Sequence, residues 1–259
     1  MSYKFKHILV VNHSTVIDNS TLARWIVAVQ TQVYSHFGPV WGINAELKIG
    51  TDKDLVTSPD AGVIYIVDTP DQKGLDGVLG YHDYTPQGNP VGYVFAKTDL
   101  DYHLSPSVTF SHEVLEMLGD VFCSWCTLVA IGNTPTLYSI EVCDAVEDDS
   151  DGYLVNGVQV SNFVYPDWFE PASRARQFDF RHELKMPLEI RPGGYMSIFR
   201  IGVDKEWTNI DGGKATRLEV KKQTRPTYTR MYKRNRALEA QSHMMSLVQA
   251  AKILNLDKE

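Results

Sequence analysis

An imidazole and three carboxylates gather in one short stretch of this sequence. His112, Glu116 and Asp120 stand four residues apart, so a helix would place them along one stripe, with Glu113 beside it. Apolar residues surround them, and residues 98–173 contain no lysine or arginine. Because burying unpaired carboxylates costs several kcal/mol each, we expect a divalent metal ion to offset their charge. Such an ion could polarise a carbonyl group and acidify a bound water, which is the chemistry of hydrolysis.

Local signals predict that this stretch is a helix. Ser105 and the proline after it suit the start of a helix, and Gly119 suits its end. His112 and Glu116 would then lie about 6 Å apart along the axis and could converge on one ion. Asp120 would lie about 12 Å from His112 along a straight helix. We therefore expect Asp120 to orient a ligand, or to bind the ion only if the chain turns at Gly119.

The elements expected around this helix form a sheet that can support it. Continuous apolar runs predict buried strands at residues 7–11, 44–49, 62–67 and 90–96. A helix capped by Asn19–Ser20 is expected to end at Gly38–Pro39. Downstream, the turn residues Asn156–Gly157 predict a hairpin over residues 153–160.

The order of these elements and the motif His112-Glu113-x-x-Glu116 together resemble the zincin metallopeptidases, whose motif ends in a second histidine. The resemblance implies an α+β fold in which a mixed, twisted sheet backs the active-site helix. It also implies a zinc-dependent peptidase with His112 and Glu116 as metal ligands and Glu113 as general base. The substitution at Glu116 makes the ligand set harder, which suits Mn²⁺ or Ca²⁺ nearly as well as Zn²⁺.

Two acids downstream of the helix are candidates for a third ligand. Glu141-x-x-Asp144 lies in a mostly apolar context, so either side chain could reach a buried ion. In the gluzincin branch of the zincins, a downstream glutamate completes the metal site and a nearby aspartate supports it. The resemblance therefore implies Glu141 as the third ligand, with Asp144 as a supporting residue or alternative ligand.

The zincin comparison also implies an edge strand that runs along the substrate cleft. It assigns this role to residues 91–95, where Gly92, Tyr93 and Val94 would pair through the main chain with an extended peptide or protein substrate. His82 and Asp83 precede this strand and could line the cleft, although a surface turn is the simpler interpretation.

Spaced motifs are also similar to a poorly characterised family found in bacteria and in tailed bacteriophages. They occupy residues 111–116, 141–144, 158–163 and 192–195. This resemblance implies a zincin-like scaffold without an assigned activity and, for a phage member, a place in the virion. The alternative to a peptidase is therefore a structural virion or assembly protein whose metal site is structural or inactive.

Charge divides the chain into two parts. Residues 1–199 carry 12 Lys+Arg against 25 Asp+Glu, a net −13, whereas residues 200–259 carry 13 against 7, a net +6. We expect a metal-binding domain at 1–199 and an irregular basic extension with a terminal helix at 200–259. The extension could bind virion proteins. Beyond Tyr228 and Tyr232 it lacks a stacking aromatic pattern, so a protein contact is favoured over nucleic acid.

Two broad features bear on location. No stretch has the organisation of a signal peptide or enough consecutive apolar residues to span a membrane, so we expect a protein of the cytoplasm or of a virion. Cys123, Cys126 and Cys143 are too few for a disulfide scaffold, so we expect reduced thiols.

Overall fold

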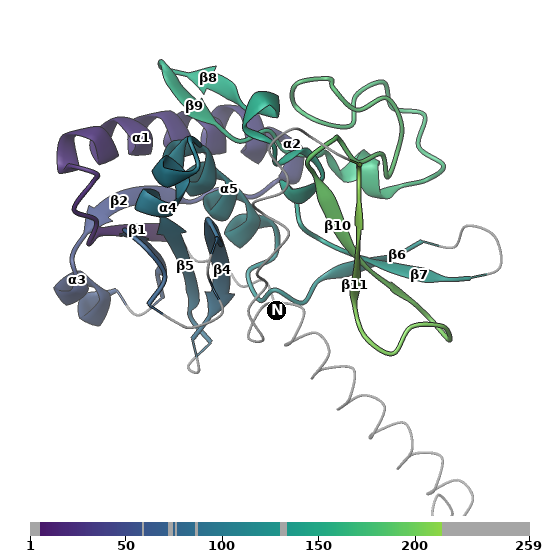
Figure 1. Ribbon diagram of the computed structural model, residues 1–259, viewed down its shortest axis with the longest axis horizontal. Coiled ribbons are helices and arrows are strands. Elements are labelled where there is room, and N and C mark those ends of the chain that lie inside the picture. Colours follow the sequence, from purple (N-terminus) through teal and green to yellow (C-terminus); the bar gives the residue numbers. More distant parts are fainter. Residues whose placement is uncertain are drawn as a thin grey trace, which may run out of the picture.

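A five-stranded sheet forms the largest layer of the protein (Figure 1). The computed structural model describes residues 6–58, 60–71, 75, 77–85, 88–129 and 134–213. The strand order is β2-β1-β3-β5-β4, in which the first four strands run parallel and β4 is antiparallel to β5. The strands are β1 (His7–Asn12), β2 (Glu46–Gly50), β3 (Gly62–Val67), β4 (Gly80–Tyr84) and β5 (Pro90–Phe95).

The edge of this sheet differs from the prediction. Residues 91–95 belong to β5, which lies between β3 and β4 and is paired on both sides: Gly92 stands opposite Ile64 on β3 and His82 on β4. The expected role of Gly92, Tyr93 and Val94 as a substrate-binding edge is therefore wrong, because their main chain already pairs within the sheet. The strand at this edge is β4, which the sequence interpretation treated as a turn.

The helix after β1 is longer than predicted. It comprises α1 (Asn19–Thr31), a π-helical segment (Gln32–Phe37) and α2 (Gly38–Trp41). The side chain of Asp18, and not Asn19 or Ser20, caps its start by accepting a hydrogen bond from the Thr21 nitrogen. The helix does not end at Gly38–Pro39, because a proline in the first turn of α2 is tolerated there. It ends at Gly42, whose φ is +68°.

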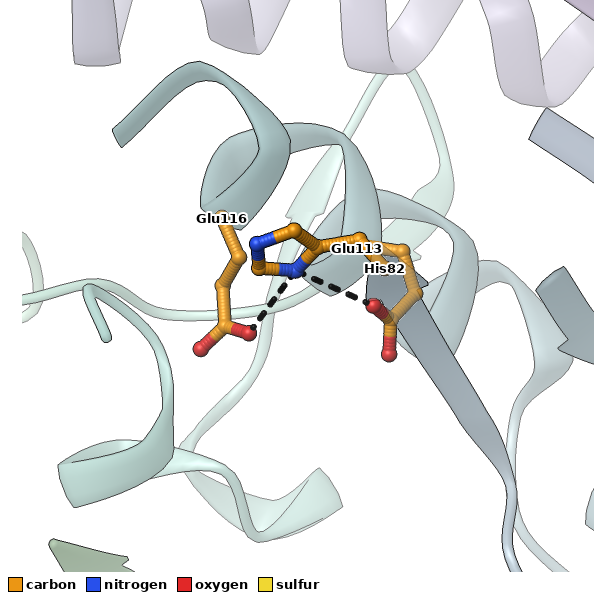
Figure 2. A group of neighbouring side chains, drawn as sticks. All are labelled: His82, Glu113 and Glu116. Atoms are coloured by element: carbon orange, nitrogen blue, oxygen red, sulfur yellow. Dashed lines mark ion pairs between the residues drawn. The ribbon is translucent and has the colours of Figure 1, made fainter. Parts of the chain in front are cut away.

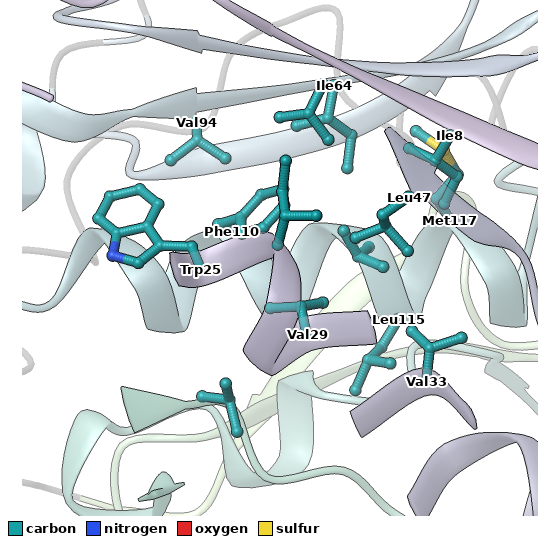
Figure 3. Packing of buried hydrophobic residues seen from close by; sticks show 14 of the residues in the cluster. Ile8, Trp25, Val29, Val33, Leu47, Ile64, Val94, Phe110, Leu115 and Met117 are labelled. Carbon is teal, nitrogen blue, oxygen red and sulfur yellow. The ribbon is translucent and has the colours of Figure 1, made fainter. Parts of the chain in front are cut away.

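The helix that carries the motif is α5 (Pro106–Gly119), as predicted. It lies with α1 on one face of the sheet (Figure 1). Phe110 and Met117 are fully buried between α5 and its neighbours, and the Phe110 ring stacks on Trp25 with 6.2 Å between ring centroids (Figure 3). Burying an apolar side chain of this size contributes roughly 1.5–3 kcal/mol, so this packing holds α5 firmly on the sheet.

Smaller elements complete the described part. A second, antiparallel sheet has the order β11-β10-β7-β6, and a hairpin pairs β8 with β9, as the Asn156–Gly157 turn predicted. Short helices connect the strands. The bounds are α3 (Asp52–Thr57), α4 (Ala96–Asp101), β6 (Cys126–Val129), β7 (Thr136–Ser139), β8 (Tyr153–Val155), β9 (Val158–Val160), β10 (Tyr195–Arg200), β11 (Thr208–Asp211) and 3₁₀ helices at Asp144–Val146, Asp149–Asp151 and Pro166–Phe169.

The structure is thus mixed in α and β, which is compatible with the expected α+β class. The predicted domain boundary after residue 199 falls inside the β10–β11 pair, because Tyr195 on β10 stands opposite Asp211 on β11. The basic cluster and the terminal helix expected within 200–259 lie largely in residues 214–259, outside the described residues. Within the described ranges, no helix combines the length and apolar character needed to cross a membrane.

Candidate metal centre

Three parts of the chain meet at the candidate site: α5, the edge strand β4 and residues 140–146. Gly119, the last residue of α5, makes this meeting possible. A Cβ atom at Gly119 would lie 2.8 Å from Cγ1 of Val142, closer than real Cβ contacts allow. The glycine therefore serves the close approach of the segment that carries Glu141 and Asp144.

One candidate group combines His112 and Glu116 from α5 with Asp144. Nε2 of His112 lies 3.2 Å from Oε1 of Glu116 and 3.3 Å from Oδ1 of Asp144. The His112 side chain is 12% exposed, whereas those of Glu116 and Asp144 are 0% and 2% exposed. The helical spacing of His112 and Glu116 thus brings them together as expected, and a third acid from a distant part of the chain joins them.

The charges of this group shift its protonation equilibria. Burial alone lowers the pKa of His112, but the Glu116 carboxylate and the hydrogen bond with Asp144 outweigh it, so the pKa lies well above the usual value. Burial, reinforced by the negative charge of Glu116, raises the pKa of Asp144 from 3.8 to about 8. Both raised pKa values indicate that His112 and Asp144 retain their protons near neutral pH when no metal ion is bound.

A second candidate group lies on the other side of Glu116 and includes a residue from β4. Nδ1 of His82 lies 3.5 Å from Oε2 of Glu116 and 3.7 Å from Oε2 of Glu113 (Figure 2). None of the three side chains is more than 4% exposed. In each group the potential ligand atoms lie within 4.8 Å of one another, so this buried group too could hold a metal ion.

The main chain fixes the orientation of the His82 ring. Nε2 of His82 lies 3.3 Å from the main-chain oxygen of Asp120, and a carbonyl oxygen can only accept a hydrogen bond. Nε2 therefore carries hydrogen, which leaves Nδ1 facing the two glutamates. The preferred sequence interpretation, a surface turn at residues 82–83, is wrong for His82, whose exposed fraction is 0%. No local signal in the sequence reveals this burial, because it follows from the pairing of β4 with β5.

The two remaining predicted acids are buried but belong to neither group. Glu141 is 1% exposed, and its charge helps to raise the pKa of Asp144. The third place beside His112 and Glu116 is taken by Asp144, the predicted alternative, because the chain turns before Asp144 and enters a short 3₁₀ helix there. Asp120 accepts a hydrogen bond from the Trp125 nitrogen with Oδ2, at 2.9 Å, and it orients His82 through its main-chain oxygen.

The region concentrates negative charge. Five acidic residues supply it, and none of these residues is more than 3% exposed: Glu113, Glu116, Asp120, Glu141 and Asp144. Among the described residues, no lysine or arginine is buried with them. Cys123 and Cys143 are buried and Cys126 is exposed, and none of them contributes to either group. The chemistry of the donor set therefore fits a divalent cation.

Comparison of the chain with protein families, with curated proteins and with solved structures found no match.

Proposed function

We propose that this protein is a metal-dependent hydrolase of zincin type, and specifically a peptidase, whose ion is bound by His112, Glu116 and Asp144. One observation carries the proposal: an imidazole nitrogen on a buried helix has carboxylate oxygens from two different elements within 3.3 Å. Catalytic zinc sites use three protein ligands and leave a further position open. One nitrogen and two oxygen donors suit Zn²⁺ or Mn²⁺, whereas Ca²⁺ takes six to eight oxygen ligands.

Asp144 replaces Glu141 as the proposed third ligand. A bound divalent ion would supply Lewis-acid chemistry by polarising a substrate carbonyl and lowering the pKa of a water molecule. His112, Glu116 and Asp144 would hold it, and in the part of the chain that the structure describes no lysine or arginine is buried beside them to compete for the carboxylates. The partial exposure of His112, 12%, leaves this group the more accessible of the two.

Glu113 is the proposed general base. One oxygen of its carboxylate lies within 4.8 Å of a Glu116 oxygen, which places Glu113 beside the proposed ion without making it a ligand of that ion. From there the carboxylate would accept a proton from the attacking water and donate it to the amine that leaves. Gly80 on β4 makes room for the Glu113 side chain, because a Cβ atom at residue 80 would lie 2.9 Å from Oε1 of Glu113.

The edge strand supports a peptide as the substrate. An extended chain can add to a sheet edge through main-chain hydrogen bonds, and β4 is the edge strand beside α5. Figure 1 shows β4 on the side of the large sheet that faces the second sheet. His82 on β4 contacts both glutamates of the motif, so a peptide paired with β4 would run past the proposed ion.

Replacing Glu113 with glutamine tests the proposed base. Because the amide cannot accept the proton, kcat for hydrolysis of casein or of a peptide library should fall by about 10²- to 10⁴-fold. The ion at His112 does not depend on Glu113, so metal analysis should still find at least one ion per chain. Glu170→Gln, at an exposed glutamate, is the matched control and should change neither quantity. Full activity in Glu113→Gln would remove Glu113 from the mechanism, and a metal-loaded wild-type protein that cleaves no peptide would refute the peptidase.

The deep burial of the ligands favours a second candidate function. Structural metal sites are closed, and Glu116 and Asp144 are at most 2% exposed. The protein would then be a structural virion or assembly protein that keeps a zincin-like scaffold and attaches through residues 200–259. Deleting residues 214–259 should abolish incorporation into particles while leaving metal content unchanged, and unaltered incorporation would contradict this role.

A further inference from the structure

We propose that Glu116 bridges two divalent cations, the second of which is bound by His82, Glu113 and Glu116. The proposal rests on the proposed metal centre at His112, but its test requires no catalytic activity. It assigns a ligand role to His82 and makes Glu113 a ligand through Oε2.

The two oxygens of Glu116 face two different histidines. Oε1 lies 3.2 Å from Nε2 of His112, and Oε2 lies 3.5 Å from Nδ1 of His82. A carboxylate that uses one oxygen for each ion is a common bridge in centres whose metals lie about 3.5–4 Å apart. Each ion would then have one imidazole nitrogen, one oxygen of Glu116 and one further carboxylate, from Asp144 on one side and Glu113 on the other.

The distances around His82 match ligand spacing better than hydrogen bonding. Nitrogen and oxygen ligands lie about 2.0–2.2 Å from zinc, so two ligands of a tetrahedral site are about 3.4 Å apart. The distances from Nδ1 of His82 to Glu116 and Glu113 are 3.5 and 3.7 Å. Hydrogen bonds from nitrogen to oxygen are usually about 2.7–3.2 Å long. The separations therefore leave room for an ion among the three atoms.

The orientation of His82 also suits a metal ligand. Metal-binding histidines commonly donate their other N–H group to a carbonyl or carboxylate, which fixes the ring and its tautomer. The Asp120 main-chain oxygen, 3.3 Å from Nε2, provides this contact. The lone pair of a neutral His82 then lies on Nδ1 and points at the two glutamates, an arrangement that a cation between them would stabilise (Figure 2).

The negative charge of the region is large enough to balance two divalent ions. The five buried carboxylates carry a formal −5 when they are ionised and the histidines are neutral. One divalent ion would leave a net −3 in a buried environment, whereas two would leave −1. Because uncompensated buried charge is costly, the second ion removes most of the remaining penalty.

Metal stoichiometry tests the proposal on the full chain. The protein is freed of metal with a chelator, equilibrated with Mn²⁺ or Zn²⁺ by dialysis, and analysed by mass spectrometry of the elements. We expect two ions per chain in the wild type and one in His82→Gln, whose amide can still reach the Asp120 oxygen. The control His7→Gln alters an exposed pair, in which Nδ1 of His7 lies 3.2 Å from Oε2 of Glu46, and should retain two ions.

Electron paramagnetic resonance of the wild-type protein gives a readout that does not depend on any variant folding. Two Mn²⁺ ions bridged by Glu116 should give the spectrum of a coupled pair in the wild type, and His82→Gln should give that of an isolated ion. A single ion per chain with an uncoupled spectrum would overturn the second site and leave the proposed single-ion hydrolase standing. Two coupled ions without hydrolysis would support the centre and refute the enzyme.

Discussion

Replacing Asp144 with asparagine should change two properties of the protein in opposite directions. The folded state raises the pKa of Asp144 from 3.8 to about 8, through burial and the charge of Glu116. Between these values the unfolded chain is ionised at this position while the folded metal-free protein keeps the proton. The unfolded state therefore binds fewer protons, so the free energy of unfolding of the metal-free protein falls as pH rises through this window. Asparagine cannot ionise and avoids that loss.

The size of the gain in stability follows from the raised pKa of Asp144. Each pKa unit corresponds to about 1.4 kcal/mol, so a shift of this size makes several kcal/mol available at pH 7. The asparagine also weakens the contact with Nε2 of His112, now 3.3 Å from Oδ1. We therefore expect metal-free Asp144→Asn to be more stable than the wild type by about 2 kcal/mol at pH 7. Near pH 4, where the gain disappears and only the weakened contact remains, we expect it to be less stable than the wild type. Loss of a charged ligand should lower ion affinity at His112 at least about 100-fold, or about 2.7 kcal/mol.

Urea unfolding at pH 4, 5.5 and 7, after the metal has been removed with a chelator, measures the stability of the metal-free protein. Competition with a fluorescent chelator measures its ion affinity. Asp52→Asn is a matched control, because Oδ2 of Asp52 pairs with Nε2 of His13 at 3.0 Å but the aspartate is 63% exposed. The control should change neither quantity appreciably, since exposed pairs contribute little. If Asp144→Asn bound the ion as tightly as the wild type, Asp144 would not be a ligand. If it gained no stability between pH 4 and 7, the buried charge would not carry the cost inferred here.

Two further predictions concern the close packing and the protons of the site. Gly119→Ala should destabilise the protein by roughly 1–3 kcal/mol and weaken ion binding, because its Cβ would meet Val142 at 2.8 Å. Gly50→Ala, whose Cβ would have ordinary 3.4 Å contacts, is the control, and equal melting temperatures for the two variants would contradict the reasoning. Ion affinity should rise with pH through neutrality, because the raised pKa values of His112 and Asp144 require protons to leave as the ion binds. Calorimetric titration in buffers of different ionisation enthalpy counts those protons, and release of none would contradict this linkage.

Much of the secondary structure could be predicted because it rests on local patterns. Strands β1, β3 and β5 are continuous apolar runs buried in a mainly parallel sheet, and such runs are recognisable without knowledge of their partners. The Asn156–Gly157 hairpin and helix α5 also follow from turn and cap residues. Within α5, the helical period alone determines that His112 and Glu116 can approach one another.

The remaining features of the site depend on contacts between distant parts of the chain. The stretch Gly80–Tyr84 is short and partly polar, and it is a strand because β5 offers it a pairing edge; this pairing buries His82 beside Glu113 and Glu116. Asp144 reaches His112, in place of Glu141, because Gly119 admits the Val142 segment closely and the chain then turns.

The sequence by itself therefore determined the candidate metal-binding motif on α5, since its geometry is that of one helix. Tertiary structure decided which residues complete the two groups around Glu116. The physical reason is that a strand edge and a close glycine contact exist only once separate elements have packed together.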